Sequence, residues 1–210
     1  MKPLKALITI LFLTVLSVSA QTKSTFGVKG GLNIASTTNS TGVVNSFSAG
    51  AFADIKLTRA LYFQPGVFYS GKGLKQLPTP SYSTTRIRYI NVPLNFVYKL
   101  AAGPGNFFIG AGPFVAVAVS ATEKGYGSSN YDSPAMSHYE VKVPIGNDNR
   151  LEDASYNNLK RMEYGATALA GYHLKNGLLL SVNYDLGLTS IRYSSSYKTR
   201  VLGISVGYTF

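Results

Sequence analysis

The chain has 210 residues, no cysteine, no tryptophan and a formal net charge of +11. The absence of cysteine excludes a disulfide framework, a thiol nucleophile and thiolate metal ligands. The positive charge raises the question of nucleic acid. However, the basic residues are scattered rather than clustered, so we expect no nucleic-acid partner and favour anionic lipid headgroups.

Residues 1–20 predict a secretory signal peptide. Lys2 and Lys5 give it a basic start, an apolar run follows, and small residues end it at Ala20. The apolar run is too short to cross a bilayer as a helix. We therefore expect cleavage after Ala20 and a single domain over residues 21–210.

Alternation of apolar residues with small or polar ones then predicts eight β-strands. In chain order these segments are residues 25–35, 47–57, 61–72, 86–100, 107–120, 161–174, 178–190 and 198–210. Each segment reaches or exceeds the roughly 9 to 11 residues that a tilted membrane strand requires. No later segment has the run of about 18 apolar residues that a transmembrane helix needs, so a membrane location requires a closed barrel.

Short connections are expected at one end of these strands and long ones at the other. Residues 58–60, 101–106 and 175–177 are short, and Gly177 suits the left-handed position of a three-residue hairpin loop. The longest connection at the opposite end covers residues 122–159. This asymmetry is typical of periplasmic turns and extracellular loops.

The last segment alternates most clearly. Its large residues, which also form the expected signal for the barrel-insertion machinery, are Leu202, Ile204, Val206, Tyr208 and Phe210. The residues between them are small and uncharged, which suits a narrow lumen better than a surface in water. The sequence thus predicts an all-β, eight-stranded antiparallel up-and-down transmembrane β-barrel in the outer membrane.

Outward aromatic residues fall at the predicted strand ends. The residues near the periplasmic rim are Phe26, Phe63, Tyr98, Phe107, Tyr172, Tyr208 and Phe210, and those near the other rim are Phe47, Tyr69 and Tyr164. Their positions favour interfacial girdles. Ordinary strand propensity is the alternative explanation.

Several stretches resemble the PorT-like outer-membrane β-barrel proteins. They read FGVKGGLNIA, YINVPLNFVYKL, FFIGAGPFVAVAVS, LKRMEYGATALAGYHL, NYDLGLTSI and ISVGYTF, in the order of the family. The resemblance implies an integral outer-membrane barrel of eight strands. It implies no single activity, although the namesake of the family is linked to protein secretion across the outer membrane.

Parity along the strands assigns a set of charged residues to the barrel interior. These residues are Lys29, Asp54, Lys56, Lys72, Lys99, Arg161, Glu163, His173 and Asp185. We expect them to pair across a filled lumen, because a barrel of eight strands has little room beyond its own side chains. A narrow polar conduit is the alternative.

The sequence offers little for catalysis or metal binding. His138 and His173 are the only histidines, no G-x-S-x-G element occurs, and we expect no catalytic residue, cofactor or metal site. The stretch GNDNRLED does not have the spacing of a calcium loop. Six of the nine acidic residues, namely Glu123, Asp132, Glu140, Asp148, Glu152 and Asp153, lie in the long third loop, which we expect to be solvated.

Tyr139, Val141 and Val143 alternate with polar residues and predict a strand rising beyond the membrane. A protein or glycan ligand would most plausibly use residues 125–153, because long loops on rigid barrels carry binding. The favoured function is a non-catalytic barrel that displays its loops or supports envelope integrity or secretion assemblies. A small-solute channel and a lipid-modifying enzyme are the alternatives.

Overall fold

The computed structural model describes residues 24–77, 81–127, 136–146, 159–193 and 196–210. The predicted signal peptide, residues 1–20, lies outside these ranges. No helix in the described ranges is long and apolar enough to cross a membrane.

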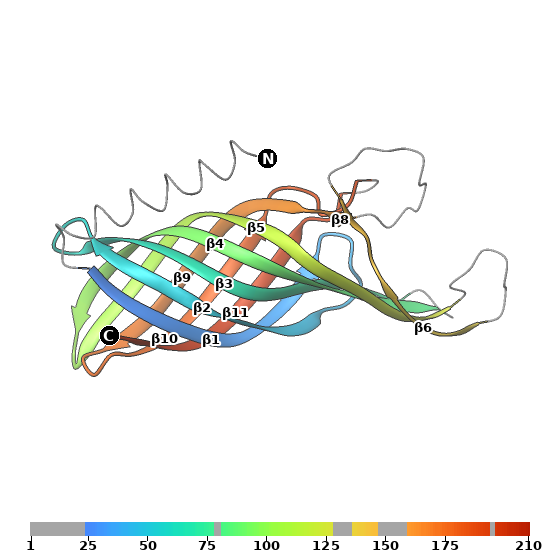
Figure 1. Ribbon diagram of the computed structural model, residues 1–210. Coiled ribbons are helices and arrows are strands. Elements are labelled where there is room, and N and C mark those ends of the chain that lie inside the picture. The colour runs from blue at the N-terminus through green and yellow to red at the C-terminus, as the bar shows by residue number, and fades with distance from the viewer. Residues whose placement is uncertain (1–23, 78–80, 128–135, 147–158, 194–195) are drawn as a thin grey trace.

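Eight antiparallel strands form a closed ring (Figure 1). They are β1 (Ser24–Thr37), β2 (Val44–Lys56), β3 (Leu61–Gln76), β4 (Tyr82–Ala102), β5 (Gly105–Gly127), β9 (Met162–Leu174), β10 (Leu178–Gly187) and β11 (Thr199–Thr209). Each strand pairs with the next in this order, and β11 returns to β1. The predicted fold class is confirmed.

Three shorter strands lie outside this ring. β6 (Ser137–Lys142) pairs with the far end of β5, while β7 (Ile145–Gly146) and β8 (Leu159–Lys160) pair with each other in parallel. In Figure 1, β6 extends away from the barrel at the end opposite the C-terminus. It covers most of the segment in which alternation predicted a strand beyond the membrane.

The strands form because their residues suit two different surroundings. On β11, Ile204 is 58% exposed on the outside of the ring, whereas its neighbours Gly203 and Ser205 are buried inside. The same alternation runs through β10, where Leu180 is exposed and Ser181 is buried. A continuous apolar exterior of this kind is stable against lipid and would promote aggregation in water.

Small residues inside the ring make room for aromatic rings. A Cβ atom at Gly165 would overlap the ring of Phe114, and one at Gly171 would overlap the ring of Phe108. Both rings are almost fully buried. At these two positions the narrow barrel needs glycine, because a large side chain crosses its lumen there.

The turns at the C-terminal end of the barrel are tight. Gly177 has a φ of 91°, in the left-handed region that its place in the hairpin loop predicted. The expected connection over residues 101–106 is shorter than predicted, because β4 and β5 continue until Ala102 pairs with Gly105. Gly103, with a φ of 57°, makes this two-residue turn possible.

At the other end, β4 and β5 extend well beyond their predicted limits. β4 starts at Tyr82 rather than at residue 86, and β5 ends at Gly127 rather than at residue 120. The beginning of the expected third loop is therefore strand. β6 joins this part of the sheet, with Thr122 opposite Lys142 and Gly127 opposite Ser137.

A β-bulge in β5 separates the barrel from this extended part. Tyr89 pairs with Ala118 but Arg88 pairs with Ser120, so Val119 is an additional residue in β5. Before the bulge, even-numbered residues of β5 face inward. After it, odd-numbered residues do, since one inserted residue exchanges the two faces of a strand.

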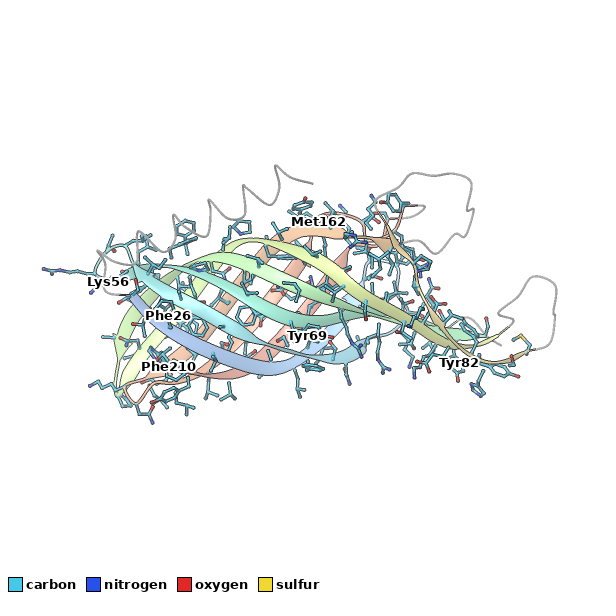
Figure 2. All side chains as sticks on the ribbon, viewed as in Figure 1. Phe26, Lys56, Tyr69, Tyr82, Met162 and Phe210 are labelled. Carbon is cyan, nitrogen blue, oxygen red and sulfur yellow. The ribbon has the colours of Figure 1, made fainter. Side chains whose placement is uncertain are left out.

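Aromatic residues lie near the ends of the apolar exterior. Figure 2 places Phe26 and Phe210 at the C-terminal end of the barrel. Ring pairs link neighbouring residues, at 5.4 Å between the centroids of Phe63 and Phe96 and 5.9 Å between those of Phe47 and Tyr69. This arrangement agrees with the girdle hypothesis, and pairs of this kind also stabilise the sheet itself.

Because the exterior of the barrel is apolar, a charged outward residue should destabilise the protein more in the middle of β4 than at its tip. Leu94→Arg lies in the middle of the apolar row and should lower the free energy of unfolding in lipid vesicles by about 2–4 kcal/mol. Tyr82→Arg is the control at the tip of the same strand (Figure 2), where the loss of the ring pair with Tyr126 should cost no more than about 1 kcal/mol. Urea unfolding followed by circular dichroism measures both. Equal effects would contradict a lipid-facing row.

Candidate functional site

A buried ion pair fills the lumen at the end of the barrel that lies towards β6. Lys72 on β3 and Glu163 on β9 lie 3.2 Å apart, with 0% and 1% of their side chains exposed. Thr199 also donates a hydrogen bond to Glu163. The Lys72 ammonium lies 5.2 Å from the ring centre of Tyr89 and 4.3 Å from that of Phe114. These contacts compensate for the removal of both charges from water.

A second polar cluster closes the opposite end of the lumen. The Lys99 ammonium lies 2.6 Å from a carboxylate oxygen of Asp54, and Gln64 donates to the other oxygen at 2.7 Å. Lys99 also lies 4.4 Å from the ring centre of Tyr62. His173 is 2.7 Å from the Thr209 hydroxyl, which in turn donates to the carbonyl of Gly177. Through Thr209, His173 therefore stabilises the turn at Gly177.

Between the two clusters lies a small polar cavity of about 40 Å³. Its lining includes Lys29, Asp185 and the side chains of Asn91 and Asn95. Asp185 accepts a hydrogen bond of 3.0 Å from Thr167, and Lys29 lies 5.0 Å from the ring centre of Phe68. The volume holds about two or three water molecules, well short of an organic ligand.

The structure places most of the predicted lumen residues inside the ring. Inside are Lys29, Asp54, Lys72, Lys99, Glu163, His173 and Asp185. Lys56 and Arg161 are exposed and require correction. Lys56 is the last residue of β2, where the strand leaves the lumen, and Arg161 lies in the break before β9, where it donates to the carbonyl of Ile145.

An apolar cluster covers the lumen above the Lys72–Glu163 pair. Its members are Leu74, Ile87, Tyr89, Phe114, Ala116, Ala118, Ala121, Val143, Leu159 and Ile191. Leu159 and Ile191 come from segments that follow the third loop and β10, so the cluster ties several connections together. Alternation did not predict this cap, because it forms only when Val143, Leu159 and Ile191, from three short segments, pack on residues of β3, β4 and β5.

Glu123 anchors the extended sheet to this cap. Its carboxylate accepts hydrogen bonds from Thr85 at 2.9 Å and Tyr139 at 3.2 Å, and lies 3.7 Å from the Arg192 guanidinium. The expectation that Glu123 is solvated is wrong: only 7% of the residue is exposed, because the bulge turns it inward. Burial, and then the negative charge of Glu123, raise the pKa of the Tyr139 phenol, which keeps it a donor.

The opposite, outward face of this sheet carries a row of rings at its tip. Tyr82 pairs with Tyr126, and Tyr126 pairs with His138. Their centroids are 6.3 Å and 5.1 Å apart, respectively. His138 thus lies in an exposed aromatic row on β6, while His173 lies inside the barrel on β9. Within the described ranges, no group of three potential ligands could hold a metal ion.

The C-terminal strand presents its predicted row to the outside. Leu202, Ile204, Val206, Tyr208 and Phe210 are all exposed on one face, with Phe210 at 76%. Tyr208 and Phe210 contact each other edge to face at 5.5 Å between centroids. Recognition of this row by the insertion machinery stays a prediction.

A family model described as an outer membrane protein β-barrel domain matches residues 19–193. The chain belongs to this family. It is an outer-membrane β-barrel protein. No curated protein sequence matches it.

Several solved barrels have a similar fold at low identity. Ail of Yersinia pestis, in complex with the heparin analogue sucrose octasulfate, is 9% identical with a TM-score of 0.43, over 90% of this chain and 99% of that one. Neisserial surface protein A is 14% identical with a TM-score of 0.48, over 90% and 99%. The N-terminal barrel of OprF from Pseudomonas aeruginosa is 9% identical with a TM-score of 0.31, over 89% and 100%.

Substitutions of Lys72 and Glu163 should have strongly non-additive effects on the free energy of unfolding. Glu163→Gln leaves the Lys72 charge buried without its carboxylate and should cost about 3–5 kcal/mol of unfolding free energy. Adding Lys72→Met should recover much of that loss, because the uncompensated charge is gone. Urea titrations in detergent compare the Glu163→Gln variant and the double variant with the unmodified barrel. A double variant no more stable than the single one would contradict this account.

Substitution of Glu123 should destabilise β6 locally. Glu123→Ala removes the acceptor of Thr85 and Tyr139, so β6 should open more readily by about 2 kcal/mol while the ring stays folded. Hydrogen exchange over residues 137–142 measures the opening. The control is Glu140→Gln, which removes an exposed pair with Lys124 and should have an effect below about 0.5 kcal/mol. Equal exchange in both variants would contradict the anchoring role.

Proposed function

We propose that this protein is a non-catalytic barrel that holds a sheet extension outside the cell for binding. The extension comprises residues 82–88 of β4, residues 120–127 of β5 and β6. One observation carries the proposal: the extension is anchored to a closed barrel through Glu123, while its outer face is exposed. A rigid support with an exposed sheet favours display over transport.

The packing of the lumen argues against a channel. The Lys72–Glu163 pair, the apolar cap above it and the Lys99–Asp54 pair fill successive levels of the interior. The cavity between them has a volume of only about 40 Å³. Opening a path would require breaking at least one buried ion pair, which is costly.

The two histidines also give little support to lipid-modifying chemistry. His173 binds Thr209, whose hydroxyl is already used at the turn of Gly177, and His138 stacks in the aromatic row. Neither contact prepares a nucleophile. We therefore infer that binding, rather than turnover, is the activity of this barrel.

The resemblance to PorT-like proteins refines the proposal. A component of a secretion assembly, or of the cell envelope at large, is a suitable partner for an anchored extracellular sheet. Outer-membrane lipids would surround the apolar exterior, and the insertion machinery would recognise the row from Leu202 to Phe210. Residues 125–153, part of which lie outside the described ranges, would add a protein or glycan contact.

Site-specific photocrosslinking in living cells tests this function. A photoreactive residue in place of Tyr126, at the tip of the extension, should form crosslinks to defined partners. Protease added to intact cells should degrade these crosslinked products. The same residue in place of Arg59, at the opposite end of the barrel, is the matched control and should give different, protease-resistant adducts. Identical adducts at both positions would contradict the orientation.

Planar bilayer recordings provide the second arm of the test. Purified protein should give no stepwise conductance, because the lumen is filled at several levels. Reproducible conductance steps that increase when Lys72 and Glu163 are both made smaller would overturn the proposal in favour of a channel.

A further inference from the structure

The outward face of the extension carries a compact group of basic residues. Arg86 and Lys142 lie on either side of Thr122 in one cross-strand row, and Arg88 follows Arg86 towards the barrel. All three basic side chains are exposed. With strands about 4.8 Å apart, Arg86 and Lys142 lie within roughly 10 Å of each other at the backbone.

These three charges have no acidic partner among the described residues. Lys124, in the next row, pairs with Glu140 at 2.8 Å. The remaining acidic residues of the described ranges, Asp54, Glu123, Glu163 and Asp185, are buried inside. As far as the described residues go, the patch of Arg86, Arg88 and Lys142, called the basic patch below, is therefore able to bind an anion from outside.

The basic patch begins where the apolar exterior ends. On β4, the outward row runs through Phe96, Leu94, Val92 and Ile90, and its next member is Arg88. On β5, the outward Val117 precedes the bulge residue Val119, after which Ser120 and Thr122 face outward. Along the strands, Arg88 consequently lies about 7 Å, and the row of Arg86 and Lys142 about 14 Å, from the last apolar residue Ile90.

The rings of Tyr82, Tyr126 and His138 lie beyond the basic patch on the same face. From the barrel outwards, this face therefore changes from apolar to cationic to aromatic. A phosphorylated glycolipid of the outer leaflet has its groups in the same order: acyl chains, phosphates and then sugars. Arginine matches phosphate through paired hydrogen bonds, and an aromatic ring offers sugars an apolar face with a polar edge.

We propose that this face binds a phosphorylated glycolipid of the outer leaflet. Arg86, Arg88 and Lys142 hold its phosphate groups, and the row of Tyr82, Tyr126 and His138 contacts its sugars. The inference deepens the proposed function, since it rests on the extension lying outside the cell. Charge complementarity and continuity with the lipid-facing row favour this ligand over a protein.

Lipid binding in detergent tests the phosphate contacts directly. Native mass spectrometry compares bisphosphorylated lipid A with the same lipid after enzymatic dephosphorylation. The unmodified protein should bind the phosphorylated form at least roughly tenfold more tightly, and the triple variant Arg86→Gln, Arg88→Gln, Lys142→Gln should lose this preference. Unchanged heat-modifiable mobility in gels verifies that the variant is folded.

The matched control is Lys56→Gln, Arg59→Gln, Lys175→Gln, which removes the same charge from exposed positions at the opposite end. This variant should keep the preference for the phosphorylated lipid. An equal loss in both triple variants would overturn the inference, because net charge alone would then explain binding. So would equal binding of the two lipids by the unmodified protein.

The aromatic row has its own test. Tyr82→Ser with Tyr126→Ser should weaken binding of lipopolysaccharide that carries core sugars and leave binding of lipid A unchanged. Unchanged affinity for both would overturn the sugar contact. If the lipid preference is absent while the Tyr126 crosslinks still report a surface partner, the glycolipid inference fails and the display function stands; crosslinks on the periplasmic side would refute the display function itself.

Discussion

Closure of the ring between β1 and β11 is the constraint on which the rest of the structure depends. The pairing runs from Gly27 opposite Thr209 to Thr37 opposite Thr199, and it satisfies the last open row of backbone donors and acceptors. A sheet edge left open in hydrocarbon would cost several kcal/mol for each unsatisfied group. Once the ring is closed, each strand has only two faces. Alternation then decides whether a side chain meets lipid or the lumen, which explains why Ile204 and Ser205 have such different surroundings.

The bulge at Val119 shows how a single residue changes this arrangement. Without it, Lys124 would point towards the cap and Glu123 would point outward, since one residue exchanges the faces of a strand. With it, Glu123 joins Thr85 and Tyr139 under the cap, and Lys124 pairs with Glu140 outside. The bulge lies where the outward row of β5 changes from valine to polar residues. It therefore separates the part of the sheet whose outward residues suit lipid from the part whose outward residues suit water.

The sequence predicted the ring because membrane strands leave a local signal in every second residue. Gly177 was predictable for the same reason, since it falls in a short turn between two clear alternating segments. The extension was harder to find. The bulge breaks the alternation between Ala118 and Ser120, so the sequence pattern of β5 ends there although the strand continues to Gly127. Partners such as Lys72 and Glu163 could be placed inside but not paired, because which charges meet across a lumen depends on stagger between strands. Parity also misplaced Lys56 and Arg161, because it does not tell where a strand stops.

The distribution of charge follows from the same low-dielectric interior. Among the described residues, the basic side chains inside or under the cap are Lys29, Lys72, Lys99 and Arg192, and the acidic ones are Asp54, Glu123, Glu163 and Asp185. The two groups balance, as they must where an uncompensated charge is expensive. A net charge of +11 over the whole chain therefore leaves little excess inside the barrel. For the described residues the excess lies outside, with Arg86, Arg88 and Lys142 directly above the apolar band. The composition that first raised the question of nucleic acid is thus the consequence of a neutral lumen and a cationic rim, and a cationic rim suits a membrane whose outer surface carries phosphate.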